Sequence, residues 1–435
     1  MQFPFSLFMA ALLLPTSVFA QDQESWNAHF QTTYIRQVQP AFHSPCEGPH
    51  SLRGDPGASY SLTGTASFGP RLGESTEAYL VDPEVAQGVP LSGLGGLAAF
   101  PNGELAKTSG ASLKLYLARA FVRHTFELGG DAATVDSDAN QLKSSYDARR
   151  VVVTVGKMSV LDLFDANAYA HDPRTQFMNW SLMTYGAYDC PADARGYTDG
   201  VALDYDDGPC TLRAARYAEP RKPNGLPLDD SLLRHYGDQV ELVHTHSVGA
   251  YAGAMRVLAL RSRAIMSTYE DALAAAPAGT APSLDAVRTG AHVKTGIGGG
   301  AEQQVASDVG VFVHAMRADG KTETYAFTES DASLSSGLQL RGGRWSRDED
   351  VVGLALGADA ISSAHREYLE RGGLTSFLGD GTLRDGRERM SELYCSAELG
   401  AGFTLTADAQ RVVNPGYDMD RGPAAFHAVR LHWES

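Results

Sequence analysis

Apolar and polar residues alternate along most of the chain, in runs of about ten residues that end at Gly, Asp, Asn or Pro. The run 389–400 is a clear example, and the next run, 403–413, repeats the pattern. Because successive side chains of a strand point to opposite faces, such runs predict strands with one small, apolar face and one polar face. In these two runs the apolar face consists of Leu393, Cys395, Ala397, Leu399, Phe403, Leu405, Ala407 and Ala409.

The number of runs favours a barrel, since two alternating strands alone fit a soluble sandwich equally well. We count about sixteen, an even number, as a closed barrel with both ends in the periplasm requires. The predicted fold class is therefore all-β, a transmembrane antiparallel β-barrel. The predicted strands are 27–36, 59–70, 75–84, 113–126, 149–158, 196–206, 210–219, 238–248, 253–264, 289–301, 306–317, 331–342, 350–360, 389–400, 403–413 and 423–433.

The connections between these strands alternate in length, as the short periplasmic turns and long extracellular loops of such barrels do. Connection 127–148 breaks the alternation, which indicates either a wrong strand register there or a periplasmic appendage. The long connections are 37–58, 85–112, 159–195, 220–237, 265–288, 318–330, 361–388 and 414–422.

Two further segments stand out within this pattern. Residues 266–278 combine good helix formers with prolines at their end, which predicts a short helix inside an external loop. The glycine-rich run 296–300 lacks the strand-to-helix context of a phosphate-binding loop. Glycines in a strand that bends, or that meets bulky lumen side chains, explain it better.

The first twenty residues contain no charged side chain, and an apolar core is followed by a small-x-small site ending at Ala20. This predicts a signal peptide over 1–20, cleaved after Ala20, and a single barrel domain over 21–435. The later chain has no apolar run long enough for a membrane helix, which leaves a soluble periplasmic protein or an outer-membrane barrel. The net charge of −16 argues against nucleic-acid binding.

The sequence gives little support for catalysis, for a cofactor or for a metal. It has no G-x-S-x-G elbow and no H-E-x-x-H helix. His244 and His246 share a strand face but have no third ligand in sequence, so we favour a polar wall or rim position for them. Asp82 and Glu84 lie two residues apart at a strand end, where a lumen and a rim position are equally plausible. A carbohydrate hydrolase that uses two carboxylates, or a plugged structural barrel, remains the alternative function.

Arg119, Phe121 and Arg123 share one strand face. An arginine facing lipid at membrane depth costs about 2–4 kcal/mol, so this face is predicted to line the lumen. There the guanidinium groups either bind sugar hydroxyls beside an aromatic platform or pair with wall carboxylates for stability.

The longest predicted loop contains the stretch AYAHDPRTQFMNW, residues 168–180. His171, Asp172, Arg174 and Trp180 supply donors, acceptors and an aromatic face, a composition suited to a constriction for a neutral, hydroxyl-rich solute. The alternative is that Asp172 starts a turn at Pro173 and Arg174 anchors the loop.

Several stretches make the chain resemble the OprB-type carbohydrate-selective porins of Gram-negative outer membranes. The resemblance implies a sixteen-stranded barrel in the outer membrane and passive diffusion of monosaccharides such as glucose. It places the narrow region at Glu84, Arg119, Arg123 and the 165–180 loop, which contains Asp165, Arg174 and Trp180. The matching stretches are QTTYIRQVQPAF (31–42), PEVAQGVPLSGLGGLAAFPNGE (83–104), ARAFVRHTFELGG (118–130), VTVGKMSVLDLFDANAYAHDPRTQFMNWSLM (153–183), ARGYTDGVALDY (194–205), HREYLERGGLTSFLGDG (365–381) and NPGYDMDRGP (414–423).

The partners expected from this interpretation are small neutral sugars, outer-membrane lipid and the barrel assembly machinery, with the choice between monomer and trimer left open. Of the four cysteines, Cys46 and Cys190 both fall in predicted external loops, so a disulfide between them is conceivable. Cys210 falls near the opposite rim, and about ten strand residues separate it from Cys190. Because those residues span roughly 33 Å, a Cys190–Cys210 bond is not expected.

Overall fold

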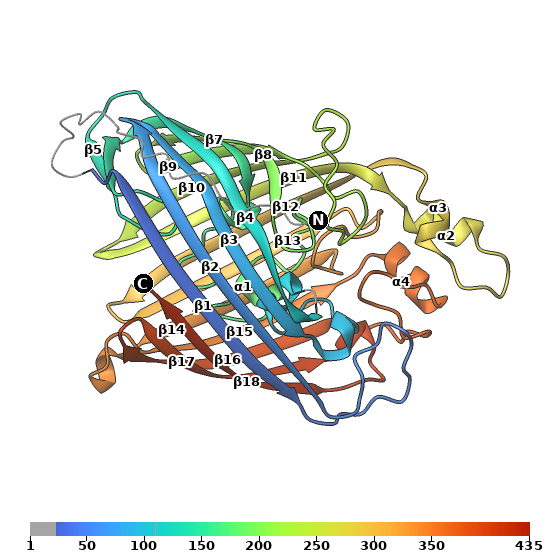
Figure 1. Ribbon diagram of the computed structural model, residues 1–435. Coiled ribbons are helices and arrows are strands. Elements are labelled where there is room, and N and C mark those ends of the chain that lie inside the picture. Colours follow the sequence, from blue (N-terminus) through green and yellow to red (C-terminus); the bar gives the residue numbers. More distant parts are fainter. Residues whose placement is uncertain (1–22, 109) are drawn as a thin grey trace, which may run out of the picture.

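The computed structural model describes residues 23–108 and 110–435, and its body is a closed antiparallel barrel of sixteen strands (Figure 1). The wall strands follow one another in sequence order, each hydrogen-bonded to the next. The barrel is closed by pairing of β1 with β18. The fold class predicted from the alternation is confirmed. The wall strands are β1 (Trp26–Gln39), β2 (Gly57–Gly73), β3 (Thr76–Val89), β4 (Gly110–Glu127), β7 (Arg149–Met158), β8 (Thr198–Asp207), β9 (Cys210–Tyr217), β10 (Tyr236–Val248), β11 (Tyr251–Met266), β12 (Gly290–Ala306), β13 (Val309–Ala318), β14 (Ala332–Arg341), β15 (Val351–Ala360), β16 (Glu388–Gly400), β17 (Phe403–Val413) and β18 (Ala424–Glu434).

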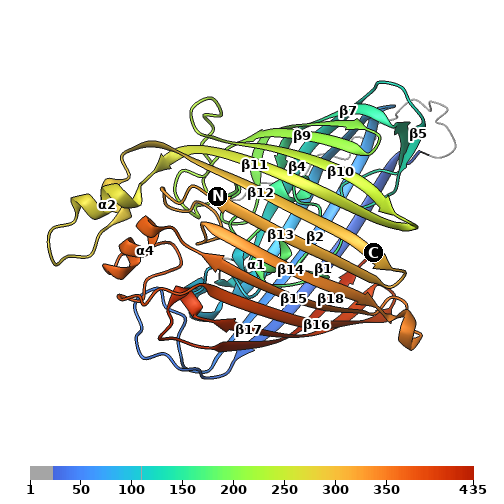
Figure 2. The same cartoon turned by 180° about the vertical axis from the view of Figure 1, so that it is seen from behind.

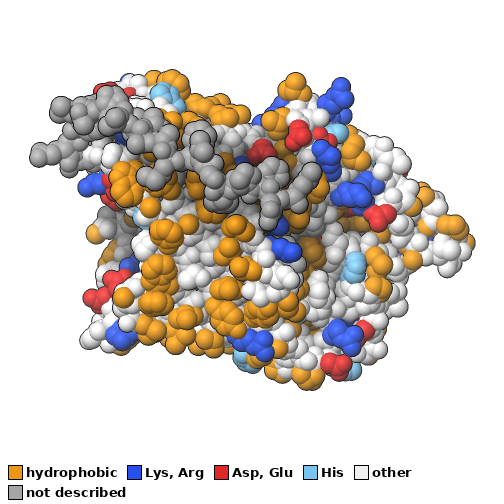
Figure 3. Space-filling view, in the orientation of Figure 1, with side chains coloured by type: hydrophobic (Ala, Val, Ile, Leu, Met, Phe, Trp, Pro, Cys, Tyr) orange, Lys and Arg blue, Asp and Glu red, His pale blue; other side chains and the backbone are white. Residues whose placement is uncertain are grey.

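The two faces of the wall are the reverse of those of a soluble sandwich. In β1, Phe30 and Tyr34 lie on the outside and are about half exposed, whereas Thr33 and Gln37 point inward and are buried. Figure 3 shows hydrophobic side chains spread over the outer wall, with Lys and Arg mainly at the margins. An apolar exterior around a polar interior is the arrangement that a lipid environment requires.

The two ends of the barrel differ in the way that the connection lengths predict. One end has tight turns, such as those between β8 and β9 and between β10 and β11, while the other bears the long loops (Figures 1 and 2). In the described chain these loops carry four short α-helices. Among the described residues no helix is long and apolar enough to cross a membrane. The helices are α1 (Trp180–Met183), α2 (Tyr269–Ala275), α3 (Leu284–Val287) and α4 (Ser363–Glu370).

Helix α2 lies within the segment where the sequence predicts a helix, and Thr268 caps it by accepting from the backbone N–H of Asp271 at 3.0 Å. The irregular connection 127–148 is an appendage and not a register error. Its β5 (Ala132–Val135) and β6 (Ser144–Asp147) form a separate two-stranded sheet at the tight-turn end of the barrel.

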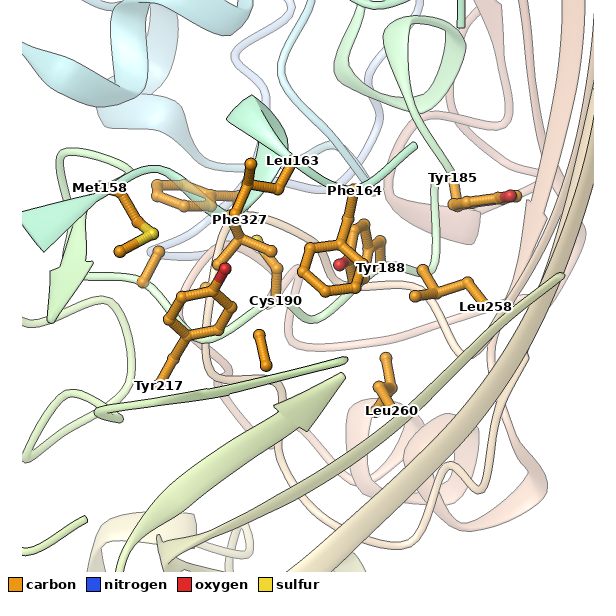
Figure 4. Close-up of a cluster of buried hydrophobic side chains, with 14 of the residues drawn as sticks. Met158, Leu163, Phe164, Tyr185, Tyr188, Cys190, Tyr217, Leu258, Leu260 and Phe327 are labelled. Atoms are coloured by element: carbon orange, nitrogen blue, oxygen red, sulfur yellow. The ribbon is translucent and has the colours of Figure 1, made fainter. Parts of the chain in front are cut away.

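The hydrophobic core lies inside the barrel, because the loop between β7 and β8 folds inward and packs on the wall. Figure 4 shows Phe164, Tyr188 and Cys190 of this loop near Leu258 and Leu260 of β11. The glycine-rich run lies in β12, where it makes room for the same loop. A Cβ atom at Gly300 would stand 2.9 Å from the hydroxyl oxygen of Tyr185.

All four cysteines are free, so the disulfide considered between Cys46 and Cys190 is absent. Cys190 is buried in the loop core, and burial raises the pKa of its thiol well above the ordinary value. The Sγ atom of Cys46 instead lies 3.5 Å from a carboxylate oxygen of Asp418. The predicted signal peptide, with its cleavage site at Ala20, lies outside the described residues.

Candidate functional site: the constricted lumen

Residues 159–197, between β7 and β8, form most of the site, and wall carboxylates fix them in the lumen. We call this segment the inward loop. Glu392 of β16 accepts hydrogen bonds from the backbone N–H groups of Met178 and Asn179, at 2.6 and 2.9 Å. Glu302 of β12 accepts from the backbone N–H of Ala168 at 2.7 Å. Met178 and Asn179 are buried, and a buried backbone N–H needs a hydrogen-bond acceptor, which Glu392 supplies.

A second loop, of which residues 90–108 are described, enters the lumen between β3 and β4. Glu388 of β16 accepts from the backbone N–H of Ala98 at 3.0 Å, which ties this loop to a strand far away in sequence. The Asn102 side chain then caps the short 3-10 helix Gly103–Lys107 by accepting from Glu104 N–H at 3.0 Å. This turn places Glu104 and Lys107 beside the inward loop.

The two loops meet the wall at a cluster of buried charges. Arg174 of the inward loop lies between two carboxylates, with Nη2 at 3.0 Å from Glu84 and Nε at 3.2 Å from Glu104. Glu84 points inward from β3, is fully buried and also accepts a hydrogen bond from Thr65 at 2.8 Å. Burial disfavours the charged form of Arg174, but the neighbouring carboxylates outweigh it and raise its pKa well above the ordinary value.

Lys107 and Tyr197 complete the cation side of this cluster. The Lys107 ammonium lies 3.8 Å from Glu84 and donates to the Tyr197 hydroxyl at 3.1 Å. Burial lowers the pKa of Lys107, but the charge of Glu84 more than compensates, so the net shift is upward. Burial and the nearby Glu84 carboxylate raise the pKa of Tyr197 to about 12. At neutral pH the lysine is therefore charged and the phenol is neutral.

Arg119 makes a two-point ion pair with Asp162, with donor–acceptor distances of 2.6 and 2.7 Å. It also lies 3.6 Å from the fully buried Asp82 of β3. Burial raises the pKa of Asp162, but the Arg119 guanidinium outweighs this effect and holds the pKa below its usual range. This pair therefore ties the start of the inward loop to β4.

Phe121 and Arg123 lie on the same inward face of β4. Arg123 donates to the backbone carbonyl of Asn140 at 3.0 Å and lies 3.7 Å from Glu77, so it also connects the wall to the β5–β6 appendage. Its guanidinium stands 5.2 Å from the centroid of the Phe121 ring. The predicted shared face of Arg119, Phe121 and Arg123 is thus present in the structure.

Two donors at the site have no acceptor among the described residues. Trp180 begins α1 and is only 6% exposed. The centroid of its ring lies 4.9 Å from the centroid of the Phe327 ring. Its Nε1–H has no hydrogen-bond partner in the described chain. The Arg195 guanidinium stacks 4.1 Å above the Tyr116 ring, and no described carboxylate lies within ion-pairing distance. Both residues line the same cavity.

That cavity has a volume of about 580 Å³, within the range of about 300–1,000 Å³ that is usual for small-molecule sites. It extends from the charged cluster to His29 and Glu434 at the tight-turn end. The formal charges of its lining are balanced, since it has five basic and five acidic side chains. These are Lys107, Arg119, Arg123, Arg174 and Arg195, and Glu104, Asp138, Asp162, Asp172 and Glu434.

The structure brings most of the residues singled out in the sequence to this region, but it separates one of them. Asp165 is fully buried away from the cavity, where it accepts from Thr184 at 2.7 Å and lies 3.2 Å from His314. Asp82 and Glu84 both face the lumen and not the rim. His244 and His246 lie near the tight-turn end of β10, and the described residues hold no group of three or more His, Cys, Asp or Glu that could bind a metal.

Sequence reasoning missed Glu104, Lys107, Asp162, Arg195 and Tyr197. Glu104, Lys107, Asp162 and Arg195 lie in loops, where the period-two pattern that located the β4 arginines gives no direction, and Tyr197 lies directly before β8 although the sequence predicts a strand from 196. Asp162 alone had a local signal, because the segment from Ser159 to Asp162 forms a capping box at the start of a short helix.

A sixteen-stranded barrel with an apolar exterior, short turns at one end and a constricted polar lumen defines the class of outer-membrane diffusion channels. The model of the family described as carbohydrate-selective porin, OprB family, matches residues 71–434. The chain belongs to this family, and it is a protein of the Gram-negative outer membrane.

Comparison with solved structures gives the same fold. OprB of Pseudomonas putida, in its high-pH structure, is similar with a TM-score of 0.66 and 15% sequence identity, over 94% of each chain. The outer membrane channel DcaP of Acinetobacter baumannii is similar with a TM-score of 0.53 and 9% identity, over 94% of this chain and 97% of that one. No curated protein sequence matches the chain.

Proposed function

We propose that the protein lets small neutral sugars, of the size of a monosaccharide such as glucose, diffuse passively across the outer membrane. The observation that carries the proposal is the constriction itself, where two loops and the wall form a small, charge-balanced cavity with aromatic surfaces. A cavity lined by equal numbers of basic and acidic side chains gives little electrostatic preference for ions, while its many donors and acceptors suit hydroxyl groups.

Individual residues have separate roles in this proposal. Arg119, Arg123 and Arg174 line the passage as hydrogen-bond donors whose positions are fixed by carboxylates, and Glu84 stands behind Arg174 as its anchor. Phe121 and Trp180 offer apolar faces for the C–H surface of a sugar ring, and the free Trp180 N–H adds a donor. Asp165 has no place among the lining residues and acts in fixing the loop.

The direct test is liposome swelling with the refolded mature protein, in iso-osmotic glucose, a disaccharide and a larger oligosaccharide. We expect rapid glucose influx and a steep decrease with solute size. Absence of influx through demonstrably folded barrels would contradict the proposal and indicate a plugged structural barrel. Release of monosaccharide from the oligosaccharide would indicate a hydrolase.

Arg195→Ala is the most informative variant for this test. Because Arg195 pairs with no described carboxylate, its truncation widens the passage without leaving a buried charge unpaired. We expect disaccharide influx to rise relative to glucose influx. Arg234→Ala, in the exposed external loop before β10, is the matched control and should leave the ratio unchanged.

A further inference from the structure

The outer wall carries a group of arginines on β9, β11 and β13 that the sugar pathway does not use. On β9, β11 and β13 the outward positions are apolar along the strand and then change to arginine close to the long-loop end. Figure 2 shows these strands, which alternate with β10 and β12, on one side of the barrel. The outward sequences are Leu212, Ala214 and Arg216 on β9, Val257, Ala259 and Arg261 on β11, and Val313, Ala315 and Arg317 on β13.

The position of these arginines matches the outer membrane–water interface. Arginine on the lipid side is costly at the bilayer midplane, but the cost falls to about 0–1 kcal/mol near the interface. Arg263, two residues beyond Arg261, continues the basic stretch toward the loops. Arg261 and Arg317 are exposed, so their charged groups stand at the surface that lipid headgroups contact.

Part of the group is held in place by an aromatic ring. The Tyr236 ring of β10 lies between two guanidinium groups, 4.0 Å from that of Arg216 and 5.4 Å from that of Arg261. Asp238 pairs with Arg216 at 2.7 and 2.8 Å, and the Tyr236 hydroxyl accepts from Arg261. These contacts orient the two cations before any ligand arrives.

The remaining positive charge of this group is not neutralised by any described carboxylate. Arg261, Arg263 and Arg317 form no ion pair with a carboxylate of the described chain, in contrast to Arg119, Arg123, Arg174 and Arg213 in the lumen. Asp238 is the one described carboxylate that pairs with this group, and it contacts Arg216. The group therefore carries excess positive charge in a chain whose net charge is −16.

The strand registers show that these side chains can reach one ligand. Arg216 and Arg261 both pair across β10 with Asp238, which puts them two strands apart, roughly 10 Å. Arg261 pairs with Thr295 of β12 and Arg317 with Ile297, so they are two strands and two residues apart, roughly 12 Å. Long arginine side chains span such separations when a headgroup carries more than one phosphate.

We propose that Arg216, Arg261, Arg263 and Arg317 form a binding site for the phosphate groups of the phosphorylated glycolipid of the outer leaflet. Arginine matches phosphate oxygens with a planar fork of donors, and its charge is attracted to an anionic headgroup layer. The apolar residues below the arginines contact the acyl chains of the same molecule. The site is independent of the sugar passage, because its side chains face outward.

The test uses the folded, full-length barrel in mild detergent, with native mass spectrometry and two probes, lipid A bearing both phosphates and the same lipid after dephosphorylation. We expect the wild-type protein to retain the phosphorylated lipid at least about tenfold better. Arg261→Gln/Arg317→Gln should remove most of this preference while heat-modifiable mobility and glucose influx stay unchanged.

Arg36→Gln/Arg411→Gln is the matched control, since these two arginines also face outward near the long-loop end but belong to β1 and β17. It should keep the preference for the phosphorylated lipid. Equal retention of both lipids by the wild type, or unchanged preference in Arg261→Gln/Arg317→Gln, would overturn the proposal. Equal loss in both double variants would also overturn it, because it would show a general charge effect and no local site.

Discussion

At the scale of single residues, Arg174 connects the inward loop to both Glu84 of the wall and Glu104 of the second loop. Its guanidinium neutralises two buried carboxylates at once, and removing one partner of a buried ion pair costs about 3–5 kcal/mol. We expect Arg174→Gln to lower the free energy of unfolding by about 3 kcal/mol, measured by urea titration of tryptophan fluorescence in detergent micelles.

A double variant separates the loss of this ion pair from a loss of packing. In Arg174→Gln/Glu104→Gln the carboxylate whose only described ion pair is the one with Arg174 is also neutral, so part of the stability should return. A double variant as unstable as the sum of its two single variants would show that the pair itself contributes little. Arg150→Gln, whose ion pair with Asp206 lies outside the cavity, serves as the control for a lost arginine.

Asp162 gives a residue-scale prediction for pH. Its pKa is held below the ordinary value of about 3.9, so the ion pair with Arg119 contributes stability that is fully present above that value. The contribution is lost only as the pH falls through the lowered pKa of the folded state. We therefore expect this tether of the inward loop to be unchanged between about pH 8 and 5 and to weaken below about pH 4.

Limited proteolysis of the inward loop at each pH measures this effect, with Asp162→Asn as the comparison. At neutral pH the inward loop of the variant should be cleaved faster than that of the wild type. Below about pH 4 the two cleavage rates should become equal. Equal cleavage of the two proteins at neutral pH would show that the tether does not hold the loop.

At the scale of elements, the inward loop acts as part of the core, and Cys190 reports on its packing. The thiol is buried and its pKa is raised, so little reactive thiolate is present at neutral pH. We expect Cys190 to resist alkylation in the folded barrel and to react rapidly after unfolding, as read by peptide mapping. Rapid alkylation of Cys190 in the folded barrel would mean that the loop leaves the lumen often.

The β5–β6 appendage gives a second prediction at this scale. Residues 137–141 of its connecting turn line the cavity, and Asn27 donates to the carbonyl of Gln141 at 2.8 Å. Replacing residues 131–147 by a short turn should widen the tight-turn end, raise single-channel conductance and admit larger sugars. An unchanged conductance would place the narrowest point wholly in the inward loop.

The sequence predicts the wall far better than the loops, and the reason is physical. Each wall side chain faces either lipid or the lumen, so an arginine at membrane depth, such as Arg119, indicates which face of its strand points inward. For a loop residue no such rule relates its position in the sequence to the direction of its side chain. The position of Lys107 depends on how two loops meet, and Asp165, placed in the passage by family resemblance, proves to be buried among Thr184 and His314.

At the scale of the whole molecule, the net charge of −16 and the balanced lining of the cavity lead to different expectations for ions. Charges remote from a narrow passage are screened within about 10 Å at moderate salt, so the lining dominates. We expect weak ion selectivity, seen as a reversal potential near zero for single channels in a steep KCl gradient. Glu104→Gln, which removes one lining carboxylate, should shift that potential toward anion selectivity. Strong cation selectivity in the wild-type channel would show that the acidic exterior and loops govern the passage and would count against a lumen adapted to neutral solutes.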